Sequence, residues 1–239
     1  MNKTVFITGG SKGIGACAVR EFSRRGYNVA FTYLSSLEKA TSLANECGAL
    51  SIYCDVSKSE DIKKAIKSTI NSFGKIDILI NNAGIDEFSL FTDITDEMWR
   101  KMIDTNLSSA FYASREVLPD MISRKDGIII NISSMWGEVG ASCEVHYSVS
   151  KAGLIGLTKA LSKEVGPSGI RVNCISPGVI DTDMNKNLSS DDIEALKQDT
   201  PLGKIGRCED VVNTMLFLCQ ESSAFITGQI LGVNGGYII

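Results

Sequence analysis

The segment Lys3-Thr-Val-Phe-Ile-Thr-Gly-Gly-Ser-Lys-Gly-Ile-Gly15 places a short apolar strand directly before a glycine-rich turn. A helical pattern follows from about Ala16 to Arg25. Glycines let the backbone approach a bound phosphate, and the free N–H groups at a helix N-terminus favour an anion. The segment therefore predicts the first strand–helix unit of a nucleotide-binding sheet. Its Gly-x-x-x-Gly-x-Gly spacing departs from the usual Gly-x-Gly-x-x-Gly, so a plain strand–helix turn is the alternative.

The same strand–helix pattern continues along the chain. Further strands are expected at Asn28–Tyr33, Ala49–Asp55, Ile76–Ile80, Gly127–Ser134, Ile170–Ser176 and Gln229–Val233, and helices at about 59–73, 95–124, 146–165, 190 onward and 209–218. Pro119 should kink the helix at 95–124 or mark its last turns. The chain shows no repeat or linker, so we expect one domain over residues 1–239. Its fold class is α/β, a doubly wound parallel sheet between two layers of helices.

Composition excludes several classes of protein. The 239 residues carry a net charge of −4, which gives no basic surface for nucleic acid or anionic membrane. No apolar run approaches the roughly 18 residues of a transmembrane helix, and a strand beginning by Thr4 leaves no room for a signal peptide. The seven cysteines are scattered and the chain has one histidine, so we expect reduced thiols, no metal site and a cytoplasmic location.

A candidate catalytic pair begins the helix after the fifth strand. Tyr147 and Lys151 are four residues apart, so both project from one face of that helix. An ammonium beside a phenol stabilises the phenolate and could lower its pKa from about 10 by roughly 1–3 units. Ser134, at the end of the preceding strand, could hydrogen-bond the same substrate oxygen. The alternative is a tyrosine and a lysine on the surface of an amphipathic helix.

The end of the second strand indicates the cofactor. An acidic side chain there would bind a ribose 2′-hydroxyl and repel a 2′-phosphate. Here the strand ends in Thr32-Tyr-Leu-Ser35-Ser36, and the first acid, Glu38, lies in the next helix. Lys12 could reach over this position from the glycine turn. The pattern favours NADP(H), and the alternative is an exposed lysine beside an undiscriminating site.

Two asparagine positions stand out in the middle of the chain. Asn81-Asn82-Ala83-Gly84 follows the fourth strand, where small and amide residues would let a flat cofactor ring lie close to the backbone. Asn106 lies in an apolar part of the helix at 95–124, and a buried amide is costly unless it is hydrogen-bonded. It could satisfy local backbone groups or hold a water molecule beside the active site.

Taken together, these elements resemble the short-chain dehydrogenase/reductase family from end to end. The matching elements, in order, are Thr8-Gly9-(three residues)-Gly13-Ile14-Gly15, Asp55-Val56, Asn81-Asn82-Ala83-Gly84, Asn106, Ser134, Tyr147-(three residues)-Lys151 and Pro177-Gly178-(three residues)-Thr182. The resemblance implies a Rossmann fold, three αβα layers and an NADP(H)-dependent oxidoreductase acting on a ketone or alcohol. It also implies a homotetramer packed through the two long helices.

The resemblance implies roles for particular residues. Tyr147 would protonate the carbonyl oxygen, Lys151 would lower the tyrosine pKa and bind the nicotinamide ribose, Ser134 would orient the carbonyl, and Asn106 would hold a relay water. Expected cofactor-binding residues are Gly9, Ser11, Lys12, Gly13, Ile14 and Gly15 at the phosphates, Ser35 at the second strand, Asp55 and Val56 at the adenine, Asn82, Ala83 and Gly84 along the cleft, and Pro177, Gly178, Ile180 and Thr182 at the nicotinamide, besides Tyr147 and Lys151.

Within the family the chain is most similar to bacterial 3-oxoacyl-acyl-carrier-protein reductases of fatty acid synthesis. Tyr147-Ser-Val-Ser-Lys-Ala-Gly-Leu154, Arg171-Val-Asn-Cys-Ile-Ser-Pro-Gly178 and Val233-Asn-Gly-Gly236 carry this similarity. A small or carrier-protein-linked ketone is the implied substrate.

Two other functions stay open. Residues 134–147 also resemble a sub-branch that reduces an amino-ketone (5-aminopentanone) on a lysine of elongation factor P, and the departure Glu144 would suit a cationic amine. An exposed rim glutamate is the alternative there. Ser134, Met135, Glu144, Tyr147 and Met184 are the expected substrate contacts. A non-catalytic NADP-binding sensor or scaffold would be a different class of answer, although such proteins often lose the tyrosine or lysine.

Overall fold

The computed structural model describes residues 2–183 and 189–239. Its strands are β1 (Thr4–Ile7), β2 (Asn28–Tyr33), β3 (Leu50–Tyr53), β4 (Ile78–Asn81), β5 (Gly127–Ile132), β6 (Ile170–Pro177) and β7 (Ile230–Val233). The α-helices are α1 (Gly13–Arg24), α2 (Leu37–Cys47), α3 (Ser59–Phe73), α4 (Asp96–Ile103), α5 (Ser109–Arg124), α6 (Trp136–Val139), α7 (Val145–Val165), α8 (Ser190–Asp199) and α9 (Cys208–Leu218). Short helical turns lie at η1 (Phe91–Asp93), η2 (Asp104–Ser108), η3 (Gly166–Ser168) and η5 (Glu221–Ser223).

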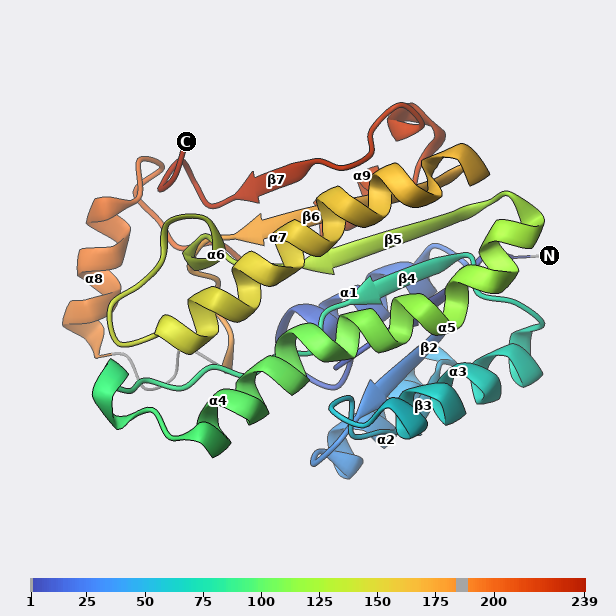
Figure 1. Cartoon of the computed structure of the whole chain (residues 1–239), viewed down its shortest axis with the longest axis horizontal. Helices are drawn as coiled ribbons and strands as arrows, with labels where there is room; N and C mark the ends of the chain where they lie inside the picture. Colours follow the sequence, from blue (N-terminus) through green and yellow to red (C-terminus); the bar gives the residue numbers. More distant parts are fainter. Residues whose placement is uncertain (1, 184–188) are drawn as a thin grey trace.

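The strands form one sheet in the order β3-β2-β1-β4-β5-β6-β7, and every neighbouring pair is parallel. This confirms the doubly wound sheet expected from the alternating pattern. The strand order reverses direction between β1 and β4, and ligands of such sheets bind beyond the carboxyl ends of the strands at that point. In Figure 1 the arrowheads of β4 to β7 point toward the end of the sheet where α6 and α8 lie.

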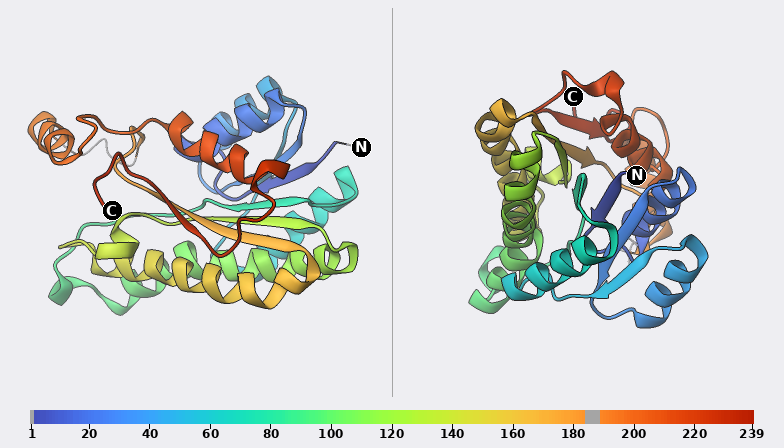
Figure 2. Two further views of the ribbon diagram at one scale, coloured as in Figure 1. Left: turned by 90° about the horizontal axis from the view of Figure 1, so that it is seen from above. Right: turned by 90° about the vertical axis from the view of Figure 1, so that its right-hand side faces the viewer.

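Helices cover both faces of the sheet, as the edge-on view in Figure 2 shows. One hydrophobic cluster joins the sheet to α1, α2 and α9, and includes Val19, Phe22 and Met215. The other joins the opposite face to α3 and α5, and includes Ile62 and Met121. Strands buried on both faces read as continuous apolar runs, which explains the isoleucines of β5. The expected three-layer αβα arrangement is confirmed.

The helix expected over 95–124 is interrupted, but not at its proline. Residues Asp104–Ser108 form a π-helical turn between α4 and α5, whereas Pro119 lies inside α5. Pro119 lies in the last two turns of α5, which is the second of the two places expected for it. The π turn coincides with Asn106, whose side chain is bound to the segment after β4, and such single turns are frequent at functional sites.

Ser134 lies beyond β5 rather than at its end. The ladder between β5 and β6 ends at the pair Ile132–Ile175, and α6 begins at Trp136. The Met135 N–H donates to Pro177 O at 2.9 Å, which continues the contact between the two strand ends. Ser134 is thereby held at the carboxyl edge of the sheet.

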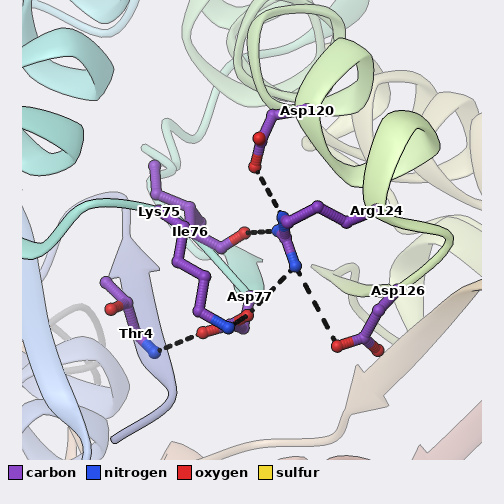
Figure 3. Close-up of polar contacts among 7 residues, drawn as sticks. All are labelled: Thr4, Lys75, Ile76, Asp77, Asp120, Arg124 and Asp126. Atoms are coloured by element: carbon purple, nitrogen blue, oxygen red, sulfur yellow. Dashed lines mark hydrogen bonds and ion pairs between the residues drawn. The ribbon is translucent and has the colours of Figure 1, made fainter. Parts of the chain in front are cut away.

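A buried carboxylate ties the opposite end of the sheet together (Figure 3). Asp77, which is 2% exposed, accepts a 2.8 Å hydrogen bond from the Thr4 N–H and pairs with Lys75 at 2.8 Å and Arg124 at 3.2 Å. Arg124 also donates to Ile76 O at 2.8 Å. The cluster fixes β4 against β1 and α5. It therefore holds together β1 and β4, the two strands between which the strand order reverses.

Several expectations from composition can be compared with the structure. All seven cysteines are free thiols, as expected. Among the described residues, no three histidine, cysteine, aspartate or glutamate side chains gather closely enough to hold a metal ion. Over the same residues, no helix has the length and apolar character to cross a membrane.

Candidate active site

The glycine turn after β1 is built so tightly that two of its positions have no room for a side chain. Gly9 has φ +67°, and a Cβ on Gly15 would lie 2.3 Å from Gly9 O. Asn82 Nδ2 donates to both Thr8 O and Gly9 O at 3.0 Å, and Thr8 Oγ1 accepts from the N–H groups of Asn82 and Ala83. Asn82 and Ala83 therefore brace the turn, which is a role that the sequence did not suggest.

The turn leads into the free N-terminus of α1. Lys12 is the N-cap residue and its side chain makes no capping hydrogen bond, and the first turn of α1 has no acidic residue. The leading N–H groups of a helix carry a partial positive charge, so this end can bind an anion. Thr182, from the segment after β6, reaches the same place, because a Cβ on Gly13 would lie 3.4 Å from its methyl group.

A surface pocket lies beside this turn, where the second strand ends. Ser11, Glu38 and Lys39 are among its lining residues. Lys39 also forms a 3.4 Å ion pair with Asp183, which joins α2 to the segment after β6. Ser35 is exposed next to α2. Sequence reasoning missed Lys39 because only the fold brings the first turn of α2 beside the glycine turn.

Asp55 and Val56 follow β3 at the same edge. Burial alone would raise the pKa of the Asp55 carboxyl, but hydrogen bonds from Ser57 and Lys58 hold that pKa below its usual range. Its Oδ1 accepts from the Ser57 hydroxyl at 2.6 Å and from the Ser57 N–H at 3.1 Å. Val56 is packed in the core at 9% exposure. These contacts fix the turn after β3 in place.

The loop after β6 packs closely on the end of β7. A Cβ on Gly178 would lie 2.8 Å from Asn234 Cα, and the Gly178 N–H donates to Val233 O at 3.0 Å. Ile180 pairs with Gly206 in a short bridge and its side chain is 4% exposed. The Ile180 side chain therefore belongs to the core.

The structure brings Ser134, Tyr147 and Lys151 together at the start of α7. All three are buried, with exposures of 8%, 7% and 4%. Lys151 Nζ lies 5.6 Å from the centre of the Tyr147 ring and donates to Ile132 O at 2.9 Å. The Ser134 hydroxyl hydrogen-bonds the Tyr147 phenol. A Cβ on Gly84 would lie 3.4 Å from Lys151 Nζ, so the segment after β4 approaches the same group.

The electrostatics of this group differ from the expectation of a more acidic phenol. Burial raises the pKa of Tyr147 above its ordinary value of 10.0, the bond from Ser134 lowers it, and the carboxylates of Asp86 and Glu144 raise it further. Burial also lowers the pKa of Lys151 to about 8. In this geometry the Tyr147 phenol is therefore less acidic than a free tyrosine, because desolvation by burial is the largest effect on its pKa. A phenol that keeps its proton at neutral pH is suited to donate it.

Asn106 does not satisfy local backbone groups. Its Oδ1 accepts from the Ile85 N–H at 2.8 Å, and its Nδ2 donates to Ile85 O at 2.9 Å and to Ser150 Oγ at 3.1 Å. The amide thereby clamps the segment after β4 against α7. Its expected role as the holder of a relay water stays a prediction.

Two carboxylates lie near the tyrosine, Glu144, which the sequence predicted, and Asp86, which it did not. Glu144, the N-cap residue of α7, is 5% exposed, which rules out the exposed rim position. Burial and the neighbouring Asp86 raise its pKa to about 7. Asp86 lies two residues after Gly84, and burial raises its pKa as well. His146 is fully buried, which agrees with a packing residue. Asp86 could have been found from the sequence, because it is an acidic residue shortly after the end of a central strand.

The remaining expected substrate contacts lie around α6. Met135 is 1% exposed, and Trp136 packs edge-on against Tyr237 with ring centres 5.8 Å apart. Met184 lies outside the described residues.

Comparisons with known proteins agree with this geometry. The family model described as Enoyl-(Acyl carrier protein) reductase matches residues 9–238. The 3-oxoacyl-(acyl-carrier-protein) reductase FabG of Staphylococcus epidermidis is 38% identical over 241 residues, which cover 99% of each chain. The FabG of Chlamydia muridarum is 40% identical over 99% of this chain and 97% of its own. A mutant short-chain dehydrogenase/reductase from Serratia marcescens superposes with a TM-score of 0.92 at 32% identity, over 98% of this chain and 97% of that one. The chain therefore belongs to the short-chain dehydrogenase/reductase family, and it is an oxidoreductase that acts on carbonyl or hydroxyl groups.

Proposed function

We propose that the protein is an NADPH-dependent reductase of ketones of the 3-oxoacyl-carrier-protein type. The observation that carries this proposal is the buried group of Ser134, Tyr147 and Lys151 at the carboxyl edge of the sheet, next to the segment after β4. The full-length similarity to proteins named 3-oxoacyl-(acyl-carrier-protein) reductase supports the substrate class.

The cofactor site fits a dinucleotide. The glycines at 9 and 15 let the turn pack closely, because a Cβ at Gly9 would lie 2.8 Å from Ala83 Cα and one at Gly15 would lie 2.3 Å from Gly9 O. The N-terminus of α1 offers N–H groups without an acidic neighbour. In the proposal, residues 9–15 hold the phosphates, Asp55 and Val56 flank the adenine, and Thr182 binds the carboxamide. The bound nicotinamide supplies the hydride.

The protein's own residues handle the proton and the oxygen. Tyr147 donates the phenol proton to the carbonyl oxygen, and Ser134 hydrogen-bonds the same oxygen and fixes the direction in which the carbonyl points. Lys151, held by Ile132 O, places a positive charge beside the phenolate that forms and so stabilises it. Asn106 keeps the loop after β4 in position and is the proposed holder of the water that returns a proton.

NADPH, rather than NADH, is the proposed cofactor. Replacing Lys12 by alanine should raise the KM for NADPH about tenfold or more, since one charge-assisted contact to a 2′-phosphate is lost, while the KM for NADH should change little. Steady-state kinetics with both cofactors measure the difference. Lys63→Ala, which removes an exposed lysine from α3, is the control. An equal change with both cofactors would contradict the assignment.

The direct test of the function is NADPH oxidation with three acceptors, namely an acetoacetyl thioester, a small amino-ketone and a neutral diketone. The proposal expects the thioester to give the highest kcat/KM. Cofactor binding without turnover of any acceptor would overturn it in favour of a sensor or scaffold.

A second candidate is reduction of an amino-ketone such as the 5-aminopentanone group on elongation factor P. The specific observation that favours it is the buried Glu144 beside Asp86, because negative charge near the tyrosine suits an amine better than an acyl thioester. A preference for the aminated acceptor that is lost in Glu144→Gln would select this candidate.

We also propose a homotetramer in a reducing compartment such as the cytoplasm. Large apolar side chains are exposed on α4, α5 and α7, namely Trp99, Phe111, Ile122 and Val149, and an interface through the two long helices would cover them. Free thiols at all seven cysteines support a reducing compartment. Light scattering on a size-exclusion column should give the mass of four chains.

A further inference from the structure

The short helix α6 begins two residues after Ser134 and lies at the carboxyl end of β6 (Figure 1). A single helical turn is not stable on its own, so contacts with other elements must hold it. Ser134 Oγ accepts a 3.2 Å hydrogen bond from the Trp136 N–H at the start of this turn. A serine hydroxyl has one proton and two lone pairs, so this bond limits where the proton and the other lone pair point. The orientation of α6 therefore sets the direction of the Ser134 hydroxyl.

One side of α6 rests on the backbone of α7. A Cβ on Gly137 would lie 2.8 Å from both the Lys151 carbonyl carbon and Ser133 Oγ, so the two helices approach very closely. Ser133 Oγ itself donates to Lys151 O at 2.8 Å. This contact fixes the distance between α6 and α7 at one residue. A single point of contact still leaves the turn free to rotate about it.

The contact that prevents this rotation comes from Glu138. Its Oε1 accepts a 2.5 Å hydrogen bond from the hydroxyl of Ser176, a fully buried residue of β6. Short bonds from a hydroxyl to a carboxylate are among the stronger hydrogen bonds in proteins. The residue Glu138 is otherwise exposed, so its carboxylate reaches from the surface into the end of the sheet. With the bond from the Met135 N–H to Pro177 O, it ties α6 to the last two residues of β6.

We propose that Glu138 is a positioning residue, which holds α6 to β6 and so fixes the direction of the Ser134 hydroxyl. This inference rests on the proposed ketone reduction, in which Ser134 and Tyr147 hydrogen-bond the same substrate oxygen, and it holds for any ketone. Without the carboxylate, the turn rotates about Gly137 and the Trp136 N–H moves relative to Ser134. A misplacement of 1 Å in an active site can lower the rate roughly 10²-fold.

The test measures kcat and KM for NADPH-dependent reduction of an acetoacetyl thioester. Glu138→Ala should lower kcat about tenfold or more and leave the KM for NADPH unchanged, because α6 takes no part in the proposed cofactor site. Glu138→Gln should recover most of the loss, since its amide oxygen can accept the same bond. Ser176→Ala removes the donor and leaves no buried hydroxyl unpaired. It should lower kcat as Glu138→Ala does, and the double variant should be no slower than either single variant.

A Ser134→Ala background separates positioning from a general structural effect. Residues that act as a unit are not additive, so Glu138→Ala should change kcat by less than about twofold once the Ser134 hydroxyl is gone. Glu60→Ala, which removes an exposed glutamate from α3, is the control and should keep full kcat. Urea unfolding shows that each variant is folded.

A normal kcat in both Glu138→Ala and Ser176→Ala would overturn the positioning role and leave the reductase standing. The same fold loss with and without the Ser134 hydroxyl would also overturn it, because Glu138 would then act on the fold in general. Failure of the unaltered protein to reduce any ketone is a different result, and it would overturn the proposed function together with the role of Glu138.

Discussion

Replacing Tyr147 by phenylalanine should lower kcat for ketone reduction by about 10³-fold, because a positioned general acid contributes roughly 10²–10⁴-fold. The substitution removes one hydroxyl from a side chain that is 7% exposed and leaves its ring packed as before. Affinity for NADPH should stay unchanged, since the glycine turn and the N-terminus of α1 are untouched. Single-turnover kinetics separate the proton-coupled step from cofactor binding.

Tyr112→Phe is the control for the loss of a phenol hydroxyl, because Tyr112 lies on α5 and packs against the core instead of the site. It should keep full activity. A Tyr147→Phe variant with near-normal kcat would show that another group protonates the oxygen, and the proposed role of Tyr147 would have to be withdrawn.

Replacing Gly15 by alanine should abolish measurable NADPH binding and also destabilise the fold by about 1–3 kcal/mol, the usual range for an overpacked site. The added Cβ would lie 2.3 Å from Gly9 O and 2.6 Å from Asn82 Nδ2. The turn must therefore open, and the N–H groups of the proposed phosphate site move with it. Urea unfolding and fluorescence titration with NADPH measure the two effects.

The control is Gly166→Ala, because this glycine is exposed at the end of α7, has φ −53°, and a Cβ there would meet no atom within 4 Å. Alanine is the better helix former by about 1 kcal/mol, so this substitution should leave the protein equally or more stable. If Gly15→Ala bound NADPH as tightly as the unaltered protein, the glycine turn would not be the phosphate site.

Much of the fold was predictable because a buried parallel strand has a simple signature. The run Gly127–Ile132 is apolar on both faces, and β2 and α3 were predicted at their observed bounds. The doubly wound order follows once strands and helices alternate. Ser134, Tyr147 and Lys151 were also predictable as a group, since the helical spacing of the last two and the strand end before them point to one edge of the sheet.

The rest depended on contacts between distant segments. Asn82 was expected along the cofactor, but its amide braces Gly9, which only the pairing of β1 with β4 makes possible. The π turn coincides with Asn106, whose amide is hydrogen-bonded to Ile85, and no local sequence pattern predicts a bond between residues 21 positions apart. Asp86 acts on Glu144, which lies 58 positions further along the chain, because the fold brings the segment after β4 close to the N-cap of α7. Local periodicity carries none of this information.

In the proposed mechanism, Tyr147 and Ser134 both hydrogen-bond one substrate oxygen while the nicotinamide transfers hydride. A crystal structure with NADP+ and the alcohol product tests this directly. We predict the reactive carbon of the nicotinamide about 3–3.5 Å from the carbinol carbon, with the carbinol oxygen hydrogen-bonded to both hydroxyls. A nicotinamide ring bound away from Tyr147, or an alcohol oxygen that touches neither hydroxyl, would contradict it.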